Sequence, residues 1–261
     1  MDLESILSNY TYLFILIMLR FAGIFIITPI FGSRIIPNRI KIGISFFMAM
    51  ITLPILQQSI IIALPENLIL IFLDLIRELA IGFSLGFIIY LVFSSLQLAG
   101  QLIDLRMGFL MVNIVDPMHG TSSPLIGQFK YILAILVFLL LNGHHILFEN
   151  IFKSFEIIPL GGFVLSNSAW HFLFRAAGDI FVIALRVALP VMGTLFIADV
   201  IFAFLARTLP QMNIFIVGLP LKILIGFIIL MLTIHGLIYF YQELFISLFK
   251  DLSRFMHLIT P

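Results

Sequence analysis

The sequence contains no cysteine and few charged residues. Without cysteine among its 261 residues, the chain has no disulfide bond, no thiolate metal ligand and no cysteine nucleophile. Lys and Arg number 14 and Asp and Glu 13, so that only 10% of the residues are charged. A soluble domain of average composition has about 25% charged residues. The chain therefore lacks the charged surface that a soluble domain presents to water.

An excess of one sign of charge is also missing, as are the common catalytic motifs. The formal net charge is +1 and no cluster of Lys and Arg occurs, which excludes a strong electrostatic attraction to nucleic acid. There is no Walker loop, no GxGxxG sequence and no HExxH sequence, and no serine in the apolar runs has a plausible base beside it. His145 and Glu149 could face the same direction on a helix, but zinc hydrolases use three protein ligands. We predict no enzyme activity, no cofactor and no metal site.

Long runs of apolar residues make up most of the sequence. Hydrophobic residues make up 62% of the chain. A helix that crosses about 30 Å of hydrocarbon needs about 20 residues, and six runs approach that length. They are residues 12–30, 42–63, 79–98, 125–142, 180–205 and 219–241. We predict an all-α, membrane-associated protein with about six long apolar helices, several of them broken by proline or glycine.

Residues 242–259 have a different pattern. Leu244, Leu248, Leu252 and Phe255 fall on one face at helical spacing, while the charged residues fall elsewhere. This pattern predicts a C-terminal amphipathic helix that lies at an interface.

Charged residues inside the apolar runs need partners. A charge at the centre of an inserted helix costs about 2.5 to 3.5 kcal/mol on insertion scales, and Arg20, Arg186 and Asp199 occupy such positions. Arg186 and Asp199 lie thirteen residues apart on one run, so helical geometry does not pair them. Their partners are expected on other segments or other chains. Two interpretations stay open: structural ion pairs in a packed bundle, or a transport pathway.

The stretch from residue 99 to residue 124 is too apolar for a solvated loop. It is also broken by Gly100, Gly108, Pro117, Gly120 and Pro124, which argues against one spanning helix. Irregular backbone at membrane depth is tolerated where it is buried in protein or lines a cavity. The pattern by itself allows a gate or an ordinary buried re-entrant loop.

A short polar connection joins the fifth and sixth runs and makes them an antiparallel helical hairpin. The residues of interest in this connection are Arg207, Pro210, Gln211, Asn213, Pro220 and Lys222. From the pattern alone, the connection is either a functional loop or a plain solvated turn.

Several motifs together resemble one protein family. They are MLRFAGIFIITPIFGSRIIPNRIKIGIS, RELAIGFSLGF, GQLIDLRMGFLMVNIVDP, NGHHILFENIFKSFEIIPLG and ARTLPQMNIFIVGLPLKI, in this order. In order and spacing the chain closely resembles the FliR family of flagellar export-gate subunits over residues 13–249. The homologous subunits of injectisomes share this architecture, although VDP followed by NGHH is closer to the flagellar branch.

The resemblance implies a structural and transport role in the inner (cytoplasmic) membrane, in the flagellar basal body. Family members assemble with FliP and FliQ, and FlhB associates with that core. Unfolded export substrates pass through it. Residues 1–179 would correspond to a FliP-like part that includes the central loop at about 99–124. Residues 180–261 would correspond to a FliQ-like hairpin followed by the amphipathic helix.

The family's plug is a loop whose apolar side chains project into the closed conduit. By resemblance it maps onto Gly108, Phe109, Leu110, Met111, Val112, Asn113, Ile114, Val115, Asp116 and Pro117. Family members tend to place aromatic residues in the middle of the plug, whereas this chain has Met111 and Ile114 there. The loop 211–220 would face the cytoplasmic entrance, where the family contacts FlhB.

Two functions of other classes compete with the export gate. A small-solute transporter or channel would bind its solute near Arg186, Pro190 and Asp199, although such transporters usually contain repeats of broken helices and none is evident. An assembly scaffold without a conduit is the other alternative. Co-purification with other subunits and ion leakage distinguish the three.

Overall fold

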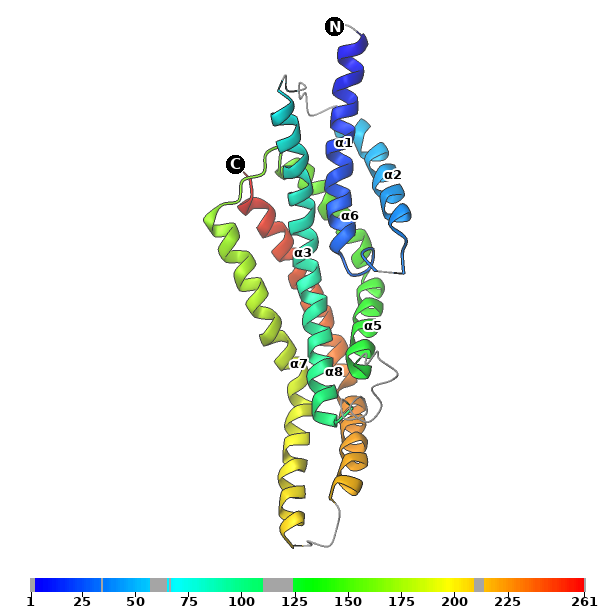
Figure 1. The fold of residues 1–261 in the computed structure, drawn as a ribbon, viewed down its shortest axis with the longest axis vertical. Helices are drawn as coiled ribbons and strands as arrows, with labels where there is room; N and C mark the ends of the chain where they lie inside the picture. The colour runs from blue at the N-terminus through cyan, green and yellow to red at the C-terminus, as the bar shows by residue number, and fades with distance from the viewer. Residues whose placement is uncertain are drawn as a thin grey trace. The chain divides into compact units, whose positions relative to one another are not determined.

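The structure is a computed structural model that describes residues 3–33, 35–56, 65, 67–109, 124–208 and 214–260. All regular structure in these residues is helical (Figure 1). The helices are α1 (Leu3–Ile27), α2 (Asn38–Leu56), α3 (Leu68–Met107), α5 (Leu125–Leu140), α6 (Gly143–Ile157), α7 (Asn167–Thr208) and α8 (Ile214–Leu258). The prediction of an all-α fold is confirmed.

Most of the helices are also long and apolar enough to cross a membrane. Within the described residues, five helices meet this condition, or six if α5 and α6 together form one span. Between α5 and α6, Asn142 adopts a left-handed conformation with a φ of 54°. The prediction of about six long apolar helices in a membrane protein is confirmed.

The predicted irregular stretch at 99–124 starts too early. Helix α3 runs for 40 residues and continues through Gly100 to Met107, so that the first part of the stretch is helical. Glu78 and Asp104 lie on this helix and are fully buried. Both carboxylates find partners inside the protein, as described below, so neither charge ends the helix. Residues 110–123 lie outside the described residues.

The predicted C-terminal amphipathic segment is helical but is not a separate helix. Residues 242–258 continue α8, which is a single helix of 45 residues. No glycine or proline lies between Tyr241 and Leu258, so nothing in the backbone interrupts the helix there. The apolar face was correctly assigned, since Leu248, Leu252 and Phe255 are buried.

The chain forms two compact units that share three helices. Unit 1 contains residues 1–91, 142–177 and 246–261, and unit 2 contains residues 92–141 and 178–245. Helices α3, α7 and α8 each continue from one unit into the other. These units do not follow a division at residue 180. The correspondence of 1–179 and 180–261 to FliP and FliQ stays a prediction.

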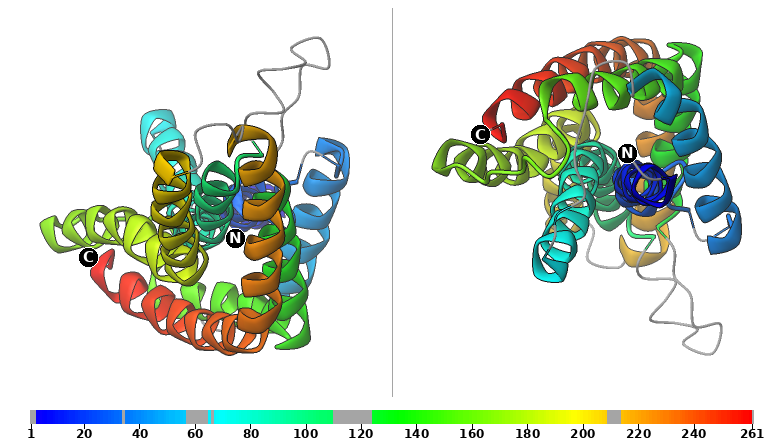
Figure 2. Two further views of the ribbon diagram at one scale, coloured as in Figure 1. Left: turned by 90° about the horizontal axis from the view of Figure 1, so that it is seen from below. Right: turned by 90° about the horizontal axis from the view of Figure 1, so that it is seen from above.

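Unit 1 is built around α1. Helix α2 lies beside α1, and the end-on views show α2 and α3 against different sides of it (Figures 1 and 2). Helices α1 and α3 cross at two glycines. A Cβ atom on Gly23 would lie 2.7 Å from the carbonyl oxygen of Leu79, and one on Gly82 would collide with the carbonyl oxygen of Arg20. The two backbones therefore touch where α1 carries its internal arginine.

Unit 2 holds a second close crossing, between α3 and α5. A Cβ atom on Gly100 would collide with the backbone of Gly127. Seven residues before Gly100 on α3, Phe93 packs against Phe138 of α5 and Phe245 of α8, with ring centroids 5.7 and 5.3 Å away. The glycine that the sequence suggested as a break in α3 is instead a helix-packing contact.

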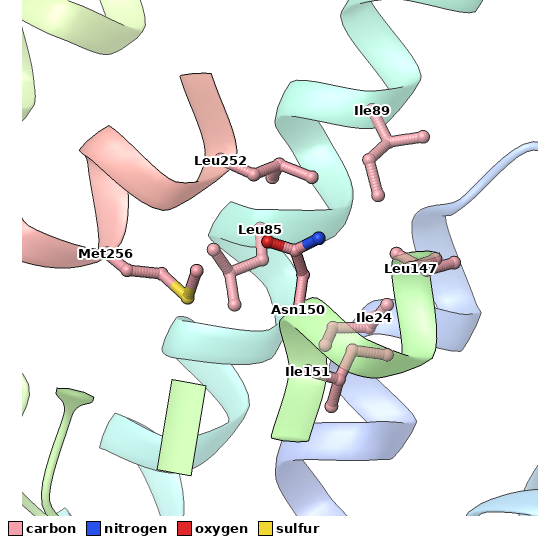
Figure 3. Close-up of a pocket in the computed structure, with 8 residues that line it drawn as sticks. All are labelled: Ile24, Leu85, Ile89, Leu147, Asn150, Ile151, Leu252 and Met256. Carbon is pink, nitrogen blue, oxygen red and sulfur yellow. The ribbon is translucent and has the colours of Figure 1, made fainter. Parts of the chain in front are cut away.

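A small cavity lies in the core of unit 1. Its lining consists of Ile24, Leu85, Ile89, Leu147, Asn150, Ile151, Leu252 and Met256 (Figure 3). Asn150 reaches into it from α6 and donates to the carbonyl oxygen of Ile146 at 2.8 Å. The cavity measures about 10 Å³, roughly the space that one water molecule needs. It is too small to hold a solute.

Candidate functional site

The internal arginine of α1 is completely buried and ion-paired. Arg20 and Glu78 of α3 are both 0% exposed. Arg20 Nε donates to Glu78 Oε2 at 2.6 Å, and Nη2 donates to Oε1 at 3.0 Å. The remaining donors reach the end of α6, with Nη1 at 2.8 Å from the carbonyl oxygen of Ser154 and Nη2 at 3.2 Å from that of Ile158. The guanidinium also lies 4.3 Å from the ring centroid of Phe155.

This arrangement fixes the C-terminus of α6 to α1 and α3. Carbonyl oxygens at the end of a helix carry partial negative charge, and a buried arginine satisfies both the charge and the hydrogen bonds. Glu78 completes the contact because its Oε1 also accepts the N–H of Gly161 at 2.8 Å. Gly161 has a φ of 73°, a backbone conformation that glycine adopts easily. Arg20 therefore has a structural role in unit 1.

A second polar group extends the network toward the surface. Tyr12 donates to Asp74 Oδ2 at 2.7 Å, and Arg77 donates to Asp74 Oδ1 at 3.0 Å. Arg77 also reaches the carbonyl oxygen of Gly161 at 3.3 Å. The Arg77–Asp74 pair is partly exposed, so we expect it to add little stability.

Sequence reasoning missed Glu78 because the predicted third run began at Leu79. The available signal was a carboxylate directly before an apolar run, together with an arginine inside a neighbouring run.

Sequence reasoning also missed the sequence GFSLG at residues 82–86, which matches the GxSxG pattern of hydrolases. That pattern requires a sharp turn between a strand and a helix. Ser84 instead lies inside α3 and donates to the carbonyl oxygen of Ile81 at 2.9 Å.

In unit 2, Asp199 of α7 forms an ion pair with Lys222 of α8. The two side chains are 33% and 26% exposed, and the pair joins the two arms of the hairpin. Arg186 does not share this contact. It is exposed on α7 and makes no ion pair with the described residues.

The predicted entrance loop is shorter than residues 211–220. Arg207 lies in the last turn of α7, and α8 begins at Ile214, so that Pro220 and Lys222 are helical. Pro220 lies inside α8, beyond the first turn, so its missing N–H removes one backbone hydrogen bond of the helix. Pro210, Gln211 and Asn213 lie outside the described residues.

The start of the predicted plug coincides with the end of α3. Gly108 has a φ of 87°, the left-handed conformation that commonly ends a helix. The N–H groups of Gly108 and Phe109 both donate to the carbonyl oxygen of Asp104, at 3.2 and 3.1 Å. The Phe109 ring lies against Phe227 of α8, with centroids 6.2 Å apart. The other plug residues, 110–117, lie outside the described residues.

The side chain of Asp104 holds the helix that follows the predicted plug. Asp104 is fully buried, and its Oδ1 and Oδ2 accept the N–H groups of Ile126 and Gly127 at 3.0 Å each. These N–H groups belong to the first turn of α5, where carboxylates are stabilised by free donors and by the helix dipole. One residue thus binds both ends of the segment between α3 and α5. Sequence reasoning missed this role because Asp104 and Ile126 are far apart in the chain.

Replacing Asp104 with alanine is expected to destabilise the protein by about 2 kcal/mol, because two buried N–H groups lose their acceptor. Thermal unfolding of the co-purified complex with FliP and FliQ in detergent measures the change. Asp179→Ala is the control, since Asp179 is exposed on α7. Equal unfolding temperatures for the two variants would contradict a stabilising role for the Asp104 carboxylate.

The two histidines in the first turn of α6 contact each other. The rings of His144 and His145 lie 4.2 Å apart, and Glu149 pairs with Lys153 at 2.7 Å. Within the described residues, no group of three or more His, Asp or Glu side chains is placed to hold a metal ion.

Comparison with known proteins matches nearly the whole chain. The family model described as "Bacterial export proteins, family 1" matches residues 11–248. The flagellar biosynthetic protein FliR of Bacillus subtilis is 34% identical over 250 residues, which cover 94% of this chain and 95% of the relative. FliR of Pectobacterium carotovorum is 31% identical, over 97% of this chain and 94% of its own length. FliR of Escherichia coli is 29% identical, over 90% and 89%.

The matched region runs from α1 to residue 248 of α8 and includes both buried carboxylates and the connection between α7 and α8. The match to the family model and the identity with several FliR proteins agree with the motifs found in the sequence. The chain therefore belongs to the FliR family, a family of bacterial export proteins of flagellar biosynthesis.

Proposed function

We propose that this protein is a structural and gating subunit of the flagellar type III protein export gate in the bacterial inner membrane. It assembles with FliP and FliQ into the conduit for unfolded export substrates, and FlhB associates with the cytoplasmic entrance. Residues 108–117 form the plug of the closed conduit. The protein has no catalytic role, and the driving force for export comes from other components.

One observation carries the assembly part of the proposal: α7 exposes apolar side chains over more length than a bilayer covers. Phe174 and Phe204 are each 68% exposed, and Phe181 and Leu189 between them are each 65% exposed. At 1.5 Å per residue, the path along α7 from Phe174 to Phe204 is about 45 Å long, whereas the hydrocarbon core is about 30 Å thick. Tilting the helix by 40° still leaves roughly 34 Å. Neighbouring subunits are therefore needed to cover part of this surface.

Helix α8 repeats the pattern. Exposed apolar residues run from Val217, at 48%, to Ile246, at 53%, with Met231 and Leu232 at 73% between them. This distance is also about 44 Å at 1.5 Å per residue. Two adjacent helices with outward apolar faces of this length suit a subunit packed among other helical subunits.

The plug part of the proposal rests on the family resemblance and on the anchoring of its two ends. Apolar side chains that close a conduit block ions, because they offer no replacement for the hydration shell. Asp104 binds the backbone on both sides of the segment, so that the ends are held while the middle is displaced by a substrate. Methionine is unbranched and adaptable, which suits a seal that must reopen and close.

The small-solute transporter is disfavoured by the placement of its proposed binding residues. Asp199 pairs with Lys222, while Arg186 is exposed and separate from that pair. The two charges therefore do not form one solute site in this chain.

Co-expression tests the proposal. The tagged chain is expected to co-purify with FliP and FliQ in a stable complex, and to aggregate or be degraded when expressed without them, because its apolar faces stay uncovered. Size-exclusion chromatography and band intensities measure the outcome. Purification as a stable monomer or homo-oligomer, with neither partner attached, would support a stand-alone transporter instead.

A further inference from the structure

Of the three internal charges noted in the sequence, Arg20, Arg186 and Asp199, Arg186 is the one for which the described part of this chain supplies no ion-pair partner. Arg20 is matched by Glu78, and Asp199 by Lys222. Arg186 lies near the middle of α7, on a helix apolar enough to cross a membrane, and it is exposed. Its neighbours on the exposed side are apolar, with Leu185 49% and Leu189 65% exposed. An arginine in such a setting requires an anionic partner or water.

The nearest acidic residue on the same side of α7 is too far away to pair with Arg186. Asp179 is exposed seven residues earlier, and two helical turns place it about 10 Å away along the axis. No ion pair joins Asp179 to Arg186 within the described residues. The described chain therefore supplies no counter-charge for Arg186.

Two glycines lie on the same side of α7 as Arg186. Gly178 and Gly193 lie eight residues before and seven residues after Arg186, and in both cases no atom of the described chain lies within 4 Å of a Cβ added there. Glycine in a helix interior weakens the helix, and here this chain's own packing gives no reason for it. Small residues on an exposed helix face let the backbone of another helix approach closely.

A second copy of the chain is a poor occupant of this face. All copies insert into the membrane in the same orientation, so a symmetric pair has its axis along the membrane normal. Such a pair would bring Arg186 of one copy to the level of Arg186 of the other. Like charges in an apolar interface repel strongly.

We propose that the face of α7 defined by Gly178, Arg186 and Gly193 receives a helix of a neighbouring export-gate subunit, and that this helix carries an Asp or Glu carboxylate opposite Arg186. The proposal rests on the proposed function, because it takes the neighbour from the same assembly. It adds the location of the contact and the chemistry of the partner.

The test compares charge variants in the co-expressed complex with FliP and FliQ. Arg186→Glu is expected to reduce recovery of the complex at least tenfold, while Arg186→Lys keeps most of it. Lys250→Glu makes the same charge change at an exposed position near the end of α8 and is expected to leave recovery unchanged. Restoration of the complex by a charge-reversed partner, described next, would show that the Arg186→Glu chain still folds.

A suppressor experiment identifies the partner chemistry. Each Asp and Glu in the apolar segments of FliP and FliQ is replaced in turn by Lys, and the variants are combined with Arg186→Glu. One of these combinations is expected to restore the complex. Gly193→Leu, which keeps the charge, is expected to lower recovery because it blocks close approach.

Three results would overturn the inference. The first is normal recovery of the complex with Arg186→Glu. The second is intact assembly with an altered ion conductance, which would place Arg186 in the conduit. The third is loss of the complex that no partner substitution repairs. If the unaltered chain fails to bind FliP and FliQ at all, the proposed function itself fails.

Discussion

Replacing Arg20 with methionine is expected to lower the free energy of unfolding by about 3 to 5 kcal/mol, the usual cost of breaking a buried ion pair by removing one partner. The loss is large because Glu78 would be left as an unpaired carboxylate with a 0% exposed side chain. The carbonyl oxygens of Ser154 and Ile158 would also lose their donors. Thermal unfolding of the complex with FliP and FliQ in detergent, or accumulation of the chain in the membrane of cells that co-express both partners, measures the effect.

The exposed ion pair on α6 provides a matched control. Lys153 and Glu149 lie 2.7 Å apart with side chains 53% and 61% exposed. Lys153→Met is expected to cost no more than about 0.5 kcal/mol, as for other exposed helix pairs. A similar small effect for both arginine and lysine variants would show that the Arg20 network does not stabilise unit 1.

A double variant separates the charge from the hydrogen bonds. Arg20→Met combined with Glu78→Leu removes both charges and leaves no unpaired ion in the core. It is expected to recover part of the lost stability relative to Arg20→Met alone. Recovery should be incomplete, because the N–H of Gly161 and the end of α6 remain without partners.

The helical fold was predictable because apolar runs report directly on membrane-length helices. The lengths of α3, α7 and α8 were not predictable in the same way. A charge near the end of an apolar run suggests an end to the helix when its partner is unknown. Arg20 and Glu78 are 58 residues apart, and Asp104 and Ile126 are 22 residues apart. Only the folded chain shows that these charges are compensated.

The same limit applies to the glycines. Gly100 and Gly108 look alike in the sequence, and both suggested a break. Gly108 ends α3 with a positive φ, whereas Gly100 stays helical and contacts α5. The difference depends on whether a partner backbone lies opposite, and Gly127 supplies it for Gly100. Distinguishing the two requires the position of α5 against α3.

The three internal charges named from the sequence differ in burial: Arg20 is buried, Asp199 is partly exposed and Arg186 is exposed. Arg20 pairs inside unit 1 and Asp199 pairs across the hairpin. Arg186 is left for a partner outside the described chain. The contacts of each charge in the folded chain, rather than the sequence pattern, distinguish them.

Replacing both Met111 and Ile114 with glycine is expected to make the closed export gate leak small ions. Both substitutions remove apolar side chains from the middle of the proposed plug, so water and ions meet less resistance there. The leak is expected to rise at least about tenfold, which corresponds to a barrier lower by about 1.4 kcal/mol. Replacing Ile35 and Leu68 with glycine is the control, since these residues are 90% and 80% exposed and lie outside the plug.

The conductance of purified complexes with FliP and FliQ in a planar bilayer tests the central claim most directly. The proposed plug predicts a closed, non-conducting complex for the unaltered chain and the control, and an ion leak for the Met111 and Ile114 variant. Unchanged conductance together with a loss of export would contradict the assignment of residues 108–117 as the plug.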